Sequence, residues 1–103
     1  MTENIEKAVF VGIITDKDEE SKVMEYLDEL EFLAETAGAT RDKKFVQRLE
    51  RPDNATYIRS GKLKEIAEYC EENEIKYVIF DDELSGTQQR NIEKIIKTCS
   101  VID

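Results

Sequence analysis

Apolar residues gather in short runs at four places along the chain, and each run predicts a β-strand. The runs Lys7–Ile14 (KAVFVGII) and Lys76–Phe80 (KYVIF) are nearly continuous, which is typical of strands covered on both faces in a parallel sheet. The segment Thr40–Leu49 mixes apolar residues with many charged ones, so it predicts an edge strand or a strand with one strongly solvated face. Ser100–Ile102 predicts a last, short strand.

Between the run Lys7–Ile14 and the segment Thr40–Leu49, apolar residues recur every three or four positions from Ser21 to Ala37. This spacing predicts an amphipathic helix. We expect Asp16 or Asp18 to cap its start, and Gly38 to end it because glycine readily adopts the left-handed conformation that closes a helix.

Two further helices are predicted in the second half of the chain. One begins at Ser60, which is expected to cap it, and extends to Asn73. The other begins at Ser85, where Gln88 three residues later completes a capping box. The inward-facing residues are expected to be Leu63, Ile66, Ala67 and Cys70 in one helix and Ile92, Ile95 and Ile96 in the other.

The alternation of strands and helices predicts an α/β fold. At 103 residues the chain is expected to form one domain, residues 1–103, with three layers (α/β/α), a mainly parallel four-stranded sheet and about three helices. Ligands of such sheets bind at the loops beyond the carboxyl ends of the strands. Those loops are expected to begin at Thr15, near Arg59 and at Asp81.

The charges are distributed unevenly. The net charge is −9, yet residues 41–64 hold eight basic and three acidic side chains, a local balance of +5 that leaves −14 for the rest. One interpretation is a surface that meets a polyanion such as RNA. The other is an exposed edge whose lysines prevent aggregation, and composition alone does not separate the two.

The turn at Gly61 and Lys62 resembles the end of a phosphate-binding loop, GxxxxGK[ST]. It fails as a nucleotide loop, because Thr56 stands at the first glycine position and Leu63 at the magnesium-ligand position. With Arg59 beside the helix start, the turn could still hold one phosphate of an RNA backbone. The alternative is an ordinary capped turn with exposed basic residues.

The acidic run Asp81, Asp82 and Glu83 follows a predicted buried strand. A phosphoacceptor carboxylate is one interpretation, but that chemistry also needs a lysine after the last strand, which the chain lacks. We therefore expect Asp81 and Asp82 to serve the start of the next helix, where negative charge is favourable.

No set of residues indicates catalysis or a metal site. The chain has no histidine, no GxSxG serine and only two cysteines, Cys70 and Cys99, which are expected to be buried free thiols. The apolar runs are too short to span a bilayer, and the charged start MTENIEKA does not resemble a signal peptide. A cytoplasmic protein is expected.

Three stretches carry a family likeness: ELEFLAETAGA (Glu29–Ala39), YIRSGKLKEI (Tyr57–Ile66) and YVIFDDELSGTQQRNIEK (Tyr77–Lys94), the last followed by CSVID. Together they resemble the N-terminal domain of HflX-type GTPases over nearly the whole chain. The sequence departs from the usual family pattern at Arg59, where glycine is common, and at Gly86, where proline is frequent.

In that family this domain precedes a helical hairpin and a GTP-binding domain, and the whole protein associates with the large ribosomal subunit and can split stalled ribosomes. The resemblance implies that this chain is not itself an enzyme and needs no cofactor, while GTP and Mg²⁺ bind to a G domain outside it. It implies as partners the rRNA of the large subunit and the protein's own G domain, with no membrane or DNA.

The resulting hypothesis is a domain that contributes RNA contact and positioning. From the charge distribution and the helix start, we expect Lys43, Lys44, Arg59, Lys62 and Lys64 to contact RNA phosphates. Two alternatives are a domain that binds a small nucleotide such as ATP at the sheet's carboxyl edge, and an intramolecular scaffold that regulates the G domain.

Overall fold

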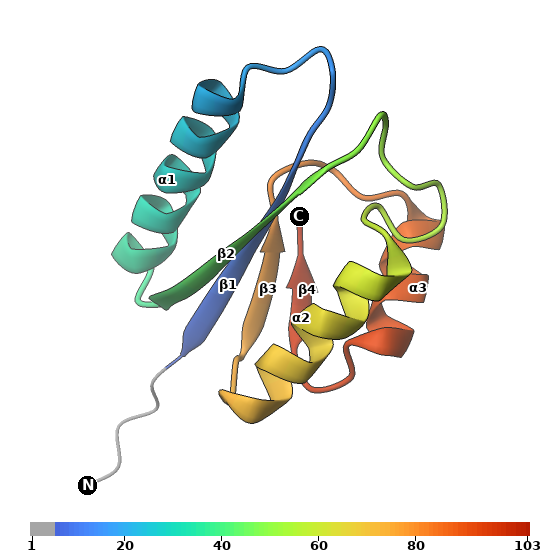
Figure 1. Cartoon of the computed structure of the whole chain (residues 1–103). Coiled ribbons are helices and arrows are strands. Elements are labelled where there is room, and N and C mark those ends of the chain that lie inside the picture. The colour runs from blue at the N-terminus through green and yellow to red at the C-terminus, as the bar shows by residue number, and fades with distance from the viewer. Residues whose placement is uncertain (1–5) are drawn as a thin grey trace, which may run out of the picture.

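A computed structural model describes residues 6–103 as a single sheet flanked by helices (Figure 1). The predicted alternation of strands and helices is confirmed. In chain order the elements are β1 (Lys7–Ile14), α1 (Glu20–Thr36), β2 (Thr40–Arg48), α2 (Ser60–Glu72), β3 (Tyr77–Phe80), α3 (Gly86–Ile95) and β4 (Ser100–Ile102).

All three strand pairings are parallel, and the strands lie in the order β2-β1-β3-β4. The charged strand β2 is therefore at an edge, as its composition predicts. β2 and β3 pair with opposite edges of β1, so the chain places its second strand on one side of β1 and its third and fourth strands on the other. The switch point of the sheet lies between the carboxyl ends of β1 and β3, where open α/β sheets bind ligands.

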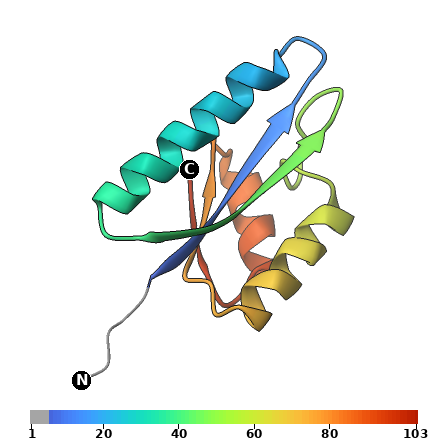
Figure 2. The same cartoon turned by 60° about the vertical axis from the view of Figure 1, so that its left-hand side comes forward.

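Helices cover both faces of the sheet, which confirms the three predicted layers. The helix α1 lies on one face, and α2 and α3 lie on the other (Figures 1 and 2). The core is correspondingly unequal, with seventeen buried residues in the cluster under α2 and α3 and three, Ala8, Phe10 and Leu27, in the cluster under α1. No helix in the described part of the chain is long and apolar enough to cross a membrane.

A β-bulge interrupts the pairing of β2 with β1. Ala8 lies opposite Arg41 and Val9 lies opposite Lys43, so Asp42 is an extra residue on β2. Both Arg41 and Lys44 consequently reach the carboxylates of α1.

The capping box at the start of α3 is confirmed. The Ser85 hydroxyl accepts a hydrogen bond from the Gln88 backbone N–H at 3.1 Å, and Gln88 Oε1 accepts one from the Ser85 N–H at 2.9 Å. These two bonds satisfy amides that have no partner within the helix.

The expected caps of the first two helices are wrong. Glu19 and Arg59 stand at the N-cap positions of α1 and α2, and neither side chain bonds the helix start. Ser60 is instead the first residue of α2. The Asp18 carboxylate accepts hydrogen bonds from the N–H and the hydroxyl of Thr15, both at 2.9 Å, which closes the loop before α1.

Candidate functional site

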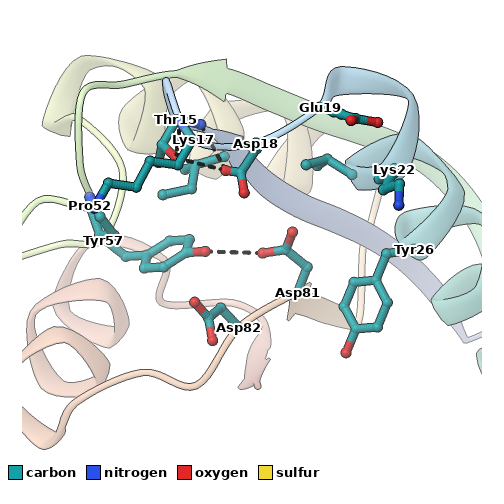
Figure 3. A pocket seen from close by; sticks show the side chains of 12 residues that line it. Thr15, Lys17, Asp18, Glu19, Lys22, Tyr26, Pro52, Tyr57, Asp81 and Asp82 are labelled. Atoms are coloured by element: carbon teal, nitrogen blue, oxygen red, sulfur yellow. Dashed lines mark hydrogen bonds between the residues drawn. The ribbon is translucent and has the colours of Figure 1, made fainter.

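A pocket of about 650 Å³ opens at the switch point of the sheet, beyond the ends of β1 and β3 (Figure 3). All three loops predicted to meet there line the pocket, among them those that begin at Thr15 and at Asp81. The third loop contributes Pro52 and Tyr57 rather than Arg59. Four carboxylates and two amines make up the charged lining: Asp18, Glu19, Asp81, Asp82, Lys17 and Lys22.

Asp81 is the central carboxylate of this pocket. Its Oδ1 accepts a hydrogen bond from the Tyr57 hydroxyl at 3.0 Å (Figure 3). Burial raises the pKa of the Asp81 carboxyl to about 6, with repulsion from Asp82 and Asp18 adding to the effect and the Tyr57 hydrogen bond opposing it. The expected role of Asp81 at the start of α3 is wrong, because that helix begins at Gly86 and Ser85 caps it.

Gly12 on β1 makes room for this carboxylate. A Cβ atom at position 12 would lie 2.8 Å from Asp81 Oδ2 and 3.1 Å from Leu27 Cδ1, both shorter than ordinary van der Waals contacts. The absence of a side chain at Gly12 therefore allows Asp81 and α1 to approach β1 closely.

Tyr57 reaches Asp81 because a tight loop presents it. Its backbone is left-handed, with φ of 67°, and it exchanges two backbone hydrogen bonds of 2.9 Å with Asp53. The Asp53 carboxylate accepts bonds from the N–H groups of Ala55 and Thr56, at 2.8 and 3.1 Å, and these bonds hold the pKa of Asp53 below its usual value. The Tyr57 ring then packs edge-on against Phe80, with centroids 5.6 Å apart.

Two side chains of α3 donate hydrogen bonds to the same loop. Gln88 Nε2 donates to the Asp53 carbonyl at 2.7 Å, and Asn91 Nδ2 donates to the Ala55 carbonyl at 3.0 Å. Both donors belong to the stretch TQQRN, which carries much of the family likeness. Their shared role is to hold the loop that positions Tyr57.

The five residues expected to contact RNA do not all lie together. Lys43 Nζ lies 5.0 Å and 4.9 Å from the ring centroids of Phe45 and Tyr69, and Lys62 Nζ lies 6.0 Å from that of Phe45. The ring of Phe45 thus brings two of the five cations together beside α2. Lys62 also lies 3.4 Å from Glu65.

Lys44 lies on the opposite side of β2, among the carboxylates of α1. It pairs with Asp28 and lies 3.5 Å from the buried Glu31, and the Asp28 hydrogen bond is the main cause that raises the pKa of Lys44. Arg41 and Arg48 also pair with acidic residues of α1. These three cations are therefore largely neutralised within the domain.

Arg59 and Lys64 are exposed at the start of α2, and within residues 6–103 no carboxylate forms an ion pair with either. The Arg59 N–H donates to Gln47 Oε1 at 3.0 Å, which fixes the entry into α2. We use the name basic surface for Lys43, Arg59, Lys62 and Lys64.

The described residues offer no metal-binding cluster and no activated nucleophile. No three His, Cys, Asp or Glu side chains in residues 6–103 are arranged to hold a metal ion. Cys70 and Cys99 are free thiols, one buried and one half-buried. Burial raises the pKa of the Cys70 thiol, which disfavours the reactive thiolate.

Comparison with known proteins identifies the family. Residues 24–103 match the family described as GTP-binding GTPase N-terminal. The GTPase HflX of Flavobacterium psychrophilum is 50% identical over 102 residues, covering 99% of this chain and 24% of its own length. The GTPase HflX of Escherichia coli is 36% identical over 98 residues, covering 95% of this chain and 22% of its own length.

A solved structure supports the fold. The crystal structure of a mutant of SsGBP superimposes with a TM-score of 0.70 over 96% of this chain and 29% of its own, at 21% sequence identity. This chain spans about a quarter of the length of the curated relatives that it matches. With a family match over residues 24–103 and relatives that share up to half of its residues, the chain belongs to the GTP-binding GTPase N-terminal family, as the N-terminal domain of a GTPase HflX.

Proposed function

We propose that this domain contacts the phosphate backbone of large-subunit rRNA through the basic surface, and so positions a cytoplasmic HflX-type GTPase on the ribosome. The observation that carries the proposal is the pairing of Lys43 and Lys62 around the ring of Phe45. One amine comes from β2 and the other from α2, and each lies within 6.0 Å of the centroid of the same ring. Such a pair can meet adjacent phosphates without reading base sequence.

The separation of charge within the domain supports this choice of surface. The cations on the α1 side of β2, Lys44 among them, are paired with carboxylates, whereas Lys43, Arg59 and Lys64 form no ion pair within residues 6–103. A polyanion would gain most from the cations that are not already neutralised. We therefore assign Lys44 a smaller share of RNA binding than Lys43, Arg59 and Lys64. Lys62 has one ion-pair partner, the exposed Glu65, whereas Lys44 has two, one of them buried.

ATP binding at the carboxyl edge of the sheet is the less favoured alternative. The pocket there has the size for a ligand, but its charged lining holds four carboxylates against two lysines. Phosphates would be repelled by this lining. Calorimetry of the isolated 103-residue domain with ATP and GTP is expected to give no heat of binding, and a measurable heat at micromolar concentrations would favour the nucleotide alternative.

The RNA proposal is tested by charge reversal in the full-length protein. The variant Lys43→Glu with Lys62→Glu is compared with Lys94→Glu and Lys97→Glu, which change the net charge equally on and after α3. Binding to purified large subunits is measured at two salt concentrations. Each lost phosphate contact is expected to reduce the slope of log affinity against log salt by about 0.7–0.9.

The result that supports the proposal is weaker binding with a smaller salt slope for the first variant alone. Equal effects of both variants would indicate a general charge effect, and no effect would remove this surface from the interface. A change in GTP turnover with unchanged ribosome binding would instead support the scaffold alternative, in which the domain acts on its own G domain.

A further inference from the structure

The β-bulge in β2 places two charged neighbours on the same side of the strand. Arg41 and Lys44 reach the carboxylates of α1. Between them in the sequence, Asp42 and Lys43 both approach Tyr69 of α2. In a regular strand, residues 42 and 43 would point to opposite faces of the sheet. The bulge therefore brings an acidic side chain next to a cation of the basic surface.

Asp42 nevertheless does not neutralise Lys43. The Asp42 carboxylate accepts a hydrogen bond from the Tyr69 hydroxyl. Lys43 Nζ lies over the Tyr69 ring, 4.9 Å from its centroid, and forms no ion pair within residues 6–103. Tyr69 thus contacts both neighbours, the acidic one through its hydroxyl and the basic one through its ring.

The Tyr69 side chain is itself held in place. Its ring packs edge-on against that of the buried Phe45, with centroids 5.5 Å apart. Lys43 Nζ also lies 5.0 Å from the centroid of Phe45, so two rings attract the same amine. The hydrogen bond with Asp42 is the main cause that raises the pKa of Tyr69 to about 12. The hydroxyl therefore keeps its proton and remains a donor at neutral pH.

An amine that lies over a ring is still available to a phosphate. The ring attracts the positive charge without neutralising it, and the three N–H donors of the ammonium group can still bond phosphate oxygens. A carboxylate partner would instead occupy those donors and cancel the charge. RNA would then have to displace the carboxylate before it could bind the amine.

We propose that Tyr69 and Asp42 are positioning residues for RNA binding. The Tyr69 hydroxyl holds the Asp42 carboxylate away from Lys43, and the Tyr69 ring holds the Lys43 amine unpaired at the basic surface. This inference rests on the proposed function of that surface and explains how one of its cations stays free beside an acidic neighbour. Without the hydroxyl, Asp42 is released to pair with Lys43.

The first test compares Tyr69→Phe, Asp42→Asn and the double variant in the full-length protein. Binding to purified large subunits is measured at two salt concentrations. Tyr69→Phe keeps the ring and is expected to weaken binding about threefold, the size of an exposed ion pair, and to lower the salt slope. In the Asp42→Asn background the competing charge is absent, so Tyr69→Phe is expected to have no further effect.

The matched control is Tyr77→Phe, which removes another hydrogen bond between a tyrosine and a carboxylate, on the α1 side of the sheet. This variant is expected to bind as the wild type does. Equal losses from Tyr69→Phe with and without Asp42 would overturn the inference. If Lys43→Glu with Lys62→Glu weakens binding but Tyr69→Phe does not, this inference fails and the proposed function stands. If neither weakens binding, the proposed function fails.

NMR of this 103-residue chain measures the position of Lys43 without RNA. The methylene protons beside its amine are expected to resonate upfield, because the rings of Phe45 and Tyr69 lie close to them. Tyr69→Phe should move these resonances toward their values in an unfolded chain, and Asp42→Asn in the same protein should return them upfield. Resonances that stay upfield in Tyr69→Phe would overturn the inference, whatever the result with ribosomes.

Discussion

The two faces of the sheet differ in the number of helices that cover them and in the number of residues that they bury. The cluster that α2 and α3 form with the sheet holds seventeen buried residues, whereas the cluster between α1 and the sheet holds three, and α1 leaves other apolar residues exposed. The side with two helices therefore holds most of the buried core. The side with one helix has a close approach at Gly12 and ion pairs between α1 and β2, and three large apolar side chains of α1 stay exposed.

The largest contrast is expected between two leucines. Leu63→Ala, in the larger cluster, should lower the free energy of unfolding by about 2–5 kcal/mol because it leaves a cavity in a closely packed core. Leu33→Ala on α1 should change it by less than about 0.5 kcal/mol in this 103-residue chain, because the side chain is already exposed. Urea denaturation of both variants measures the difference, and similar losses would contradict the comparison.

A second prediction concerns the approach of α1 to the sheet. Gly12→Ala should destabilise the domain by roughly 1–3 kcal/mol, because the new methyl group would meet Asp81 and Leu27 at 2.8 and 3.1 Å. Gly61→Ala is the matched control, since nothing lies within 4 Å of its Cβ, and it should be neutral or slightly stabilising. Thermal denaturation of the pair compares them, and a neutral Gly12→Ala would mean that Asp81 moves away freely.

A third prediction concerns pH. The folded domain binds the Asp81 proton more tightly than the unfolded chain, because the pKa is raised from 3.8 to about 6. The stability due to this group is therefore present below about pH 4 and is lost as the pH rises through 6. Asp81→Asn should gain about 1–2 kcal/mol relative to the wild type between pH 4 and pH 7.5, in urea denaturations at both values. If the difference in stability between the variant and the wild type did not change with pH, the pKa of the Asp81 carboxyl would be close to its usual value.

The smallest effect is expected from the ion pairs that fasten α1 to β2. Glu31 lies 3.5 Å from both Arg41 and Lys44, but each cation has a second carboxylate partner. Glu31→Gln should therefore cost only about 0.5–1 kcal/mol. The loss should shrink only slightly in 1 M salt, because a pair with one buried partner is screened less than an exposed pair. Urea denaturation measures the loss, and a value well above 1 kcal/mol would show that the second carboxylates do not compensate.

The fold was predictable because its signals are local. Each signal lies in residues that are close together in the sequence. They are the continuous apolar run of β1, the charged run of β2 and the capping box at Ser85 and Gln88. The positions of strand and helix, and the edge position of β2, followed from these patterns.

The candidate site was less predictable because it joins distant residues. The Tyr57–Asp81 hydrogen bond spans 24 positions and requires a left-handed tyrosine, for which no local pattern exists. The split of the lysines had a different cause. Strict alternation would put Arg41 and Lys43 on one face, but the bulge at Asp42 changes the parity and directs Arg41 and Lys44 to α1.

The hydrogen bonds of the Gln88 side chain affect local unfolding of the domain. Its amide serves two structures at once, the first turn of α3 and a loop 35 positions earlier in the chain. Neither can fray without releasing a bond that the other uses. The two segments should thus form one cooperative unit, whose amide protons exchange with deuterium at a common rate although they are remote in sequence.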